Sequence, residues 1–205
     1  MSVLTILIIR HAEKPDDPTA PWPGPSFTEA GKVDPDDKSL VIRGWQRAGS
    51  WAALFGTRLG GDDFPQPTTI YGMDPNATKG KDTSQRPFET ISPLAGRLSI
   101  KPITKYAMGD ESDLVKEIVA LTGIVLVCWE HKHIYQKILP AIAKDQDLHS
   151  MPTHWNADRF DVVLRFDRTT PKAPWTFRQL FPRLLSGDTD IPLPCSVGTT
   201  KADSE

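Results

Sequence analysis

Two short apolar runs constrain the fold of this chain more than any other feature. Residues 3–9 and 124–129 are continuous apolar runs rich in β-branched side chains, without the polar alternation of a half-exposed strand. Such runs are typical of strands covered on both faces, as in a parallel sheet between helices. Residues 161–166 predict a third strand of this kind. The first run lacks a basic segment and a small-residue cleavage pattern, so we interpret it as a strand and not a signal peptide.

Segments with helical spacing lie between these strands. We expect helices over residues 43–55, 84–98, 110–121 and 132–144, and a short strand over residues 68–71. Pro87 falls in the first turn of its helix, where the missing N–H is tolerated, whereas Pro140 should kink the fourth helix or mark its last turns. Strands that alternate with helices predict an α/β fold, a three-layer α/β/α sandwich with a mostly parallel central sheet.

Length and charge limit the classes of protein that remain. The 205 residues predict one domain over residues 1–185, followed by a polar tail over residues 186–205. Lys plus Arg total 24 and Asp plus Glu total 26, so the formal net charge is −2. This balance argues against nucleic-acid or membrane binding by bulk positive charge, and no apolar run approaches the ~20 residues that cross a bilayer. Cys128 and Cys195 show no C-x-x-C spacing, which favours a reduced, cytoplasmic protein.

A histidine follows each of the two central strands. His11 comes after the first apolar run, and His131 comes after the run over residues 124–129. The carboxyl ends of parallel strands meet at one edge of a sheet, where binding sites of such folds lie. Arg10 adjoins His11, and Arg86 lies in the first turn of the second predicted helix. Two guanidiniums and two imidazoles in one pocket suit a phosphoryl group, whose oxygens match the paired hydrogen bonds of arginine.

Four sequence elements occur in the order in which a known family has them. They are residues 7–14 (LIIRHAEK), Leu40 with residues 43–48 (RGWQRA), residues 84–90 (SQRPFET) and residues 125–131 (VLVCWEH). Together they resemble the histidine phosphatase superfamily, whose fold is phosphoglycerate-mutase-like, and they extend over roughly residues 3–140.

The resemblance implies a metal-independent phosphatase that hydrolyses phosphate monoesters and uses no cofactor. His11 would be the nucleophile that forms a phosphohistidine, while Arg10, Arg86 and His131 would bind the non-bridging oxygens. The substrate would be a small phosphorylated molecule or a phosphopeptide. Residues 14–40, rich in Pro, Asp and Gly, would cover the cleft and select the leaving group. A phosphomutase with the same intermediate and a non-catalytic phospho-ligand-binding protein remain as alternatives.

The general acid that such a reaction needs has no clear motif. Glu130 stands where the family commonly has glycine before the second histidine, which puts a carboxylate beside the phosphate pocket. Glu89 lies three residues after Arg86 and could share its helix face. The candidates for the general acid are Glu130, Glu89 and the acidic group Asp110, Glu111 and Asp113.

Further polar residues lie near the predicted pocket. Glu13, Lys14 and Arg43 are candidate substrate-binding residues, with surface ion pairing as the alternative. His131 and His133 are closely spaced, but no cysteine or carboxylate stands at ligand spacing, so no metal site is predicted. Trp22 and Trp155 are candidates for the mouth of the site, and no role is assigned to His149 and His154.

Overall fold

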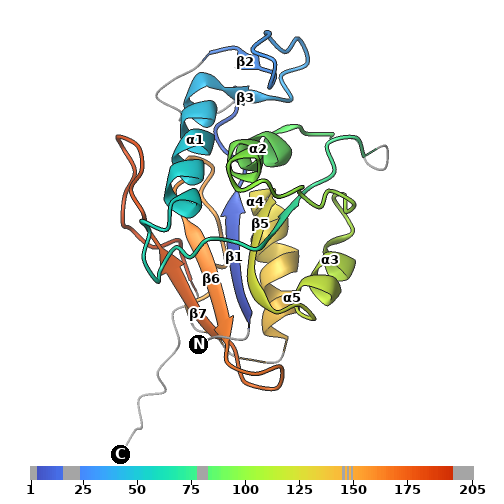
Figure 1. Cartoon of the computed structure of the whole chain (residues 1–205), viewed down its shortest axis with the longest axis vertical. Coiled ribbons are helices and arrows are strands. Elements are labelled where there is room, and N and C mark those ends of the chain that lie inside the picture. The colour runs from blue at the N-terminus through green and yellow to red at the C-terminus, as the bar shows by residue number, and fades with distance from the viewer. Residues whose placement is uncertain are drawn as a thin grey trace, which may run out of the picture.

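The computed structural model describes residues 4–15, 24–77, 83–144, 146, 148 and 150–195, arranged around a five-stranded sheet of order β4-β5-β1-β6-β7 (Figure 1). The strands are β1 (Leu4–Arg10), β4 (Thr69–Gly72), β5 (Gly123–Trp129), β6 (Val163–Arg168) and β7 (Thr176–Leu180). β5 pairs parallel with β1 and β4, whereas β6 pairs antiparallel with β1 and β7. Four of these five strands therefore run in one direction, and the mostly parallel sheet is confirmed.

Helices cover both faces of the sheet. On one face, Leu7 and Ile9 of β1 pack with apolar residues of α1 (Ile42–Gly56) and α2 (Arg86–Leu98). On the other face, Leu4, Ile6 and Ile8 pack with α3 (Glu111–Ile118) and the helical segment after β5. Because every residue of β1 is buried, a continuous apolar run is what this central position requires. The predicted three-layer α/β/α fold is confirmed.

Close packing of α1 against the end of β1 depends on a glycine. A Cβ on Gly44 would lie 2.6 Å from the carbonyl oxygen of Glu13, which is well inside van der Waals contact. The same carbonyl accepts a hydrogen bond from the backbone N–H of Val41, at 3.2 Å. The first turn of α1 is therefore fixed directly against the segment that follows His11.

The helical segment after β5 contains a wider turn ahead of Pro140. It consists of α4 (His131–His133), the π-helix η1 (Ile134–Ile138) and α5 (Leu139–Ala143). The N–H of Leu139 donates to the carbonyl of Ile134, five residues back, and Pro140 then lies in the first turn of α5. The predicted disturbance at Pro140 thus takes the form of a π segment, which accommodates a residue that has no N–H to donate.

Three strands were not predicted. β2 (Ser26–Phe27) and β3 (Leu40–Val41) form a small antiparallel sheet within the segment expected to be a loop, and β7 extends the main sheet at its edge. Within that segment, the Asp34 carboxylate accepts hydrogen bonds from the backbone N–H groups of residues 36, 38 and 39. This turn holds residues 36–38 in place beside the site described below.

Residues 186–195 pack against the domain, in contrast to the tail expected from residue 186 onward. Leu193 is buried in the core, and Asp188 forms an ion pair with Arg47 of α1. The N–H of Thr153 donates to the carbonyl of Pro194, at 2.9 Å. The rest of the expected tail, residues 196–205, lies outside the described residues.

Cys128 is buried in β5, Cys195 is exposed, and both are free thiols. Within the described ranges, none of the helices combines the length and the apolar character that crossing a bilayer would require.

Candidate active site

A cleft of about 530 Å³ lies where β1 and β5 end. Its walls come from the residues after β1, from residues 36–38, from the start of α2 and from residues 130–133. The register explains this convergence, because Arg10 pairs with Trp129, so that the next residues of both strands emerge side by side. Of the predicted site residues, the cleft brings together His11, Lys14, Arg86, Glu130 and His131.

His11 is held in one tautomer. Its Nδ1 lies 2.8 Å from the carbonyl oxygen of Ala12. A carbonyl can only accept, so Nδ1 carries the proton and Nε2 keeps its lone pair. Burial, assisted by the charges of Arg10 and Arg86, lowers the pKa of His11 well below its ordinary value. The ring is therefore neutral at neutral pH, with one nitrogen able to act as a nucleophile.

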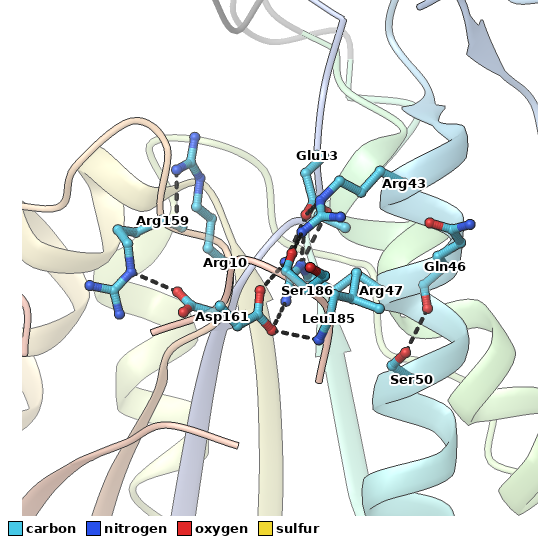
Figure 2. A network of polar contacts seen from close by, with 12 residues as sticks. Arg10, Glu13, Arg43, Gln46, Arg47, Ser50, Arg159, Asp161, Leu185 and Ser186 are labelled. Atoms are coloured by element: carbon cyan, nitrogen blue, oxygen red, sulfur yellow. Dashed lines mark hydrogen bonds and ion pairs between the residues drawn. The ribbon is translucent and has the colours of Figure 1, made fainter. Parts of the chain in front are cut away.

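Arg10 is fully buried behind His11 and binds a loop. Its Nη1 donates to the carbonyl oxygens of Asn156, Ala157 and Arg159, and its guanidinium lies 3.9 Å from the ring centre of Phe160. Figure 2 shows the guanidinium of Arg10 beside Arg159. Arg10 thus anchors the loop over residues 156–160, and its charge helps to lower the pKa of His11.

Arg86 joins the start of α2 to the segment that follows residue 36. Its Nε donates to the carbonyl of Ser39 at 3.3 Å, and its Nη2 donates to the carbonyl of Asp37. One turn later, the hydroxyl of Thr90 donates to the carbonyl of Arg86 and accepts from the N–H of Ala12, at 2.8 Å. In the sequence, Thr90 stands out only as a member of the element over residues 84–90, yet in the structure it ties α2 to the residue after His11.

Glu130 caps the helical segment and orients His131. Its Oε2 accepts from the backbone N–H of His133 at 2.9 Å, and its Oε1 lies 2.6 Å from Nδ1 of His131. Burial opposes the charged form, but these contacts outweigh it and lower the pKa of Glu130 to about 2. Glu130 is therefore ionised at neutral pH and holds no proton to donate. Burial also lowers the pKa of His131.

The other carboxylates that were candidates for the general acid lie away from the cleft lining. Glu89 accepts from the N–H of Leu40 at 2.9 Å and borders a separate hollow. Asp110 accepts from the N–H of Ala107, and Asp113 is exposed and pairs with Lys116. Glu111 is buried beside His133, a cleft residue to which no catalytic role was assigned from the sequence.

Glu13 and Arg43 lie outside the cleft, in a buried ion-pair network (Figure 2). The carboxylate of Glu13 accepts two short hydrogen bonds from Arg47, from Nε at 2.9 Å and from Nη2 at 2.8 Å, and lies 3.3 Å from Nε of Arg43. Arg47 also pairs with Asp188 at 2.8 Å. This network fastens α1 to the segment after β1 and to residues near 188, and it borders a small hollow of about 160 Å³.

The tryptophans do not form the mouth in the described structure. Trp155 is buried, and its indole N–H donates to the carbonyl of Arg159, so the prediction that it lines the mouth is wrong. Trp22 and His149 lie outside the described residues. Within the part of the chain that the structure describes, no group of three or more His, Cys, Asp or Glu side chains is arranged to hold a metal ion.

The raised pKa of Glu89 predicts that the stability of the protein depends on pH. Burial raises the pKa of Glu89 from 4.5 to about 7, so between these pH values the folded protein holds a proton that the unfolded chain releases. The contribution of Glu89 to stability therefore falls as the pH rises from 4.5 to 7. We expect Glu89→Gln to melt at a higher temperature than the wild type at pH 8, and at an equal temperature near pH 4.5. Thermal unfolding measured between pH 4.5 and pH 8 tests this, with Glu29→Gln at an exposed position as the control. Equal melting temperatures of the two variants at every pH would contradict the raised pKa of Glu89.

Comparisons with known proteins bear on the fold. No protein family model and no curated protein matches the sequence. A solved structure named as the phosphohistidine phosphatase SixA from Agrobacterium tumefaciens is similar, with a TM-score of 0.50 and 17% identity over 87% of this chain and 97% of that chain. A structure of the protein histidine phosphatase SixA with tungstate has a TM-score of 0.46 and 14% identity, with the same coverage. The first likeness concerns the fold alone, and it agrees with the phosphoglycerate-mutase-like fold that the four sequence elements predict.

Proposed function

We propose that this protein is a metal-independent phosphatase that hydrolyses phosphate monoesters through a phosphohistidine on His11. The observation that carries the proposal is the state of His11. Its Nδ1 proton is held by the carbonyl of Ala12, and its pKa is lowered, so Nε2 is a neutral nucleophile at neutral pH. A side chain that served only to bind an anion would gain nothing from staying neutral.

The surrounding groups suit an in-line transfer of the phosphoryl group. Nε2 of His11 attacks phosphorus, and Arg86 and His131 bind the non-bridging oxygens as charge builds on them. Nδ1 of His131 lies 2.6 Å from Oε1 of Glu130, so this ring would meet a bound phosphoryl group with its other nitrogen, Nε2. A phosphoryl dianion beside this ring favours its protonated form, which offsets the effect of burial. Water then attacks phosphorus and releases inorganic phosphate.

The cleft suits a small phosphorylated molecule or a phosphorylated side chain of a peptide. Its volume of about 530 Å³ exceeds what one phosphoryl group needs, and lies within the range of sites for small organic molecules. Lys14, Lys38 and Lys132 border it together with Asp36 and Asp37. This mixture of charges favours a leaving group that itself carries polar groups.

Hydrolysis of para-nitrophenyl phosphate tests the proposal directly. This leaving group needs little protonation, so the reaction reports on the nucleophile and the oxyanion-binding groups alone. We expect hydrolysis without added metal, and an unchanged rate after treatment with EDTA. Activity that disappears with EDTA and returns with a divalent cation would contradict the metal-independent mechanism. Binding of inorganic phosphate without any hydrolysis would instead support a phospho-ligand-binding protein.

A further inference from the structure

His133 combines access to the cleft with a buried carboxylate behind it. It lies two residues after His131 and lines the same cleft. Its Nδ1 lies 2.7 Å from Oε1 of Glu111, and its backbone N–H donates to Glu130. About a quarter of its side chain is exposed, at 26%, whereas only 5% of the Glu111 side chain is exposed. One edge of the imidazole therefore contacts Glu111, and the ring borders the space that a substrate would fill.

The neighbours of Glu111 fix the proton on this pair. Its carboxylate accepts from the N–H of Gly109 at 3.1 Å and from the indole N–H of Trp129 at 3.0 Å. Both of these groups can only donate, so the carboxylate oxygens of Glu111 act as acceptors toward them. Nδ1 of His133 must then be the donor in its contact with Glu111. The other ring nitrogen, Nε2, is left to exchange a proton with a bound substrate.

The two glutamates that the sequence offered as the general acid, Glu130 and Glu89, do not meet the needs of a proton donor. Glu130 is ionised and engaged with His131 and His133, and Glu89 binds Leu40 away from the cleft. Resting on the function proposed above, we propose that His133 is the general acid of the first step and the general base of the second. Glu111 is its positioning residue. The carboxylate thus acts on the substrate through an imidazole that reaches the cleft.

The reaction has two steps, formation of the phosphohistidine and its hydrolysis, and His133 transfers one proton in each. In the first, Nε2 of His11 forms a bond to phosphorus, the bond from phosphorus to the leaving oxygen breaks, and that oxygen takes the Nε2 proton of His133. The leaving alcohol departs, and His133 is neutral with its Nδ1 proton still directed at Glu111. In the second, His133 Nε2 takes a proton from water as the water oxygen attacks phosphorus. The electron pair of the N–P bond returns to His11, and phosphate leaves.

Leaving groups of different basicity test this assignment. Benzyl phosphate releases a strongly basic alkoxide and needs a proton donor, whereas para-nitrophenyl phosphate, of similar size, does not. We expect His133→Gln to lower kcat/KM about 10²–10⁴-fold for benzyl phosphate and less than about 10-fold for para-nitrophenyl phosphate. Glu111→Gln should show the same selectivity to a smaller degree. A variant that had merely lost stability would lose both activities in proportion.

Controls separate the possible failures. Lys132→Gln changes a neighbouring cleft residue and should alter both rates by the same factor. Equal losses on the two substrates in His133→Gln, or no loss on benzyl phosphate, would overturn the role of His133 while leaving the phosphohistidine mechanism standing. A wild-type protein that hydrolyses neither substrate would overturn the proposed phosphatase function itself, and the role of His133 with it.

Discussion

Replacement of His11 by asparagine is expected to lower kcat for para-nitrophenyl phosphate by at least about 10⁴-fold, because the variant has no nucleophile for the covalent step. Asparagine keeps a polar side chain that can reach the carbonyl of Ala12, so the fold around the cleft should persist. Arg86 and His131 also remain, and the variant should still bind inorganic phosphate. Steady-state kinetics together with phosphate binding therefore separate loss of chemistry from loss of the site.

The covalent intermediate provides an independent measurement. A phosphohistidine is destroyed by acid and preserved by alkali. Wild-type protein mixed with a substrate that carries a radioactive phosphoryl group should therefore retain radioactivity after an alkaline quench and lose it after an acid quench. His11→Asn should retain none. His154→Asn is the matched control, because His154 is exposed and does not line the cleft, and it should behave as the wild type. Label that survived in His11→Asn would show that another residue is the nucleophile.

Replacement of Arg47 by methionine is expected to lower the free energy of unfolding by about 3–5 kcal/mol. Arg47 lies between Glu13 and Asp188, and the three side chains are only 3%, 5% and 3% exposed, in that order. Removing the cation leaves two buried carboxylates: Glu13 keeps its contact with Arg43, at 3.3 Å, while Asp188 loses its ion pair and keeps a hydrogen bond from the backbone N–H of Leu185, at 2.9 Å. Chemical denaturation at neutral pH measures the loss.

Two comparisons make the stability prediction specific. Lys116→Met also breaks an ion pair, but this pair is largely exposed, at 74% and 65%, so its loss should change stability far less than the loss of Arg47 does. Adding Glu13→Gln and Asp188→Asn to Arg47→Met should recover part of the loss, since the unpaired buried charges disappear. Arg47→Met with a stability equal to that of Lys116→Met would contradict the structural role of the network.

Features encoded by local pattern were predicted well. β1 and β5 are buried on both faces, so their apolar runs are visible without any knowledge of their neighbours. Their parallel pairing brings His11 and His131 into one cleft. By contrast, β2 and β3 are two residues long and carry no periodicity, and β7 shows only partial burial along its length.

Long-range partners account for most of what the sequence did not reveal. Glu13 lies two residues after His11, but Arg47 and Arg43 bind it in a separate network. Arg47 also binds Asp188, which lies 141 residues further along the chain. This contact explains why the polar segment near residue 188 packs against the domain. His133 is similar, because its assignment depends on Glu111, a residue of a different helix. Such pairings arise from the tertiary fold and leave no periodic trace.

The order of strands in the sheet has a consequence for biosynthesis. β1 is made first, yet its two neighbours in the sheet are β5 and β6, which end at Trp129 and Arg168. At typical translation rates, about 8–30 s separate the synthesis of β1 from that of β6. β5 follows β1 after about 6–24 s at the same rates, and until then the apolar β1 has neither of its two partners. The strand that leads into His11 is thus synthesised well before the strands that bury it, and its apolar side chains stay exposed until they follow.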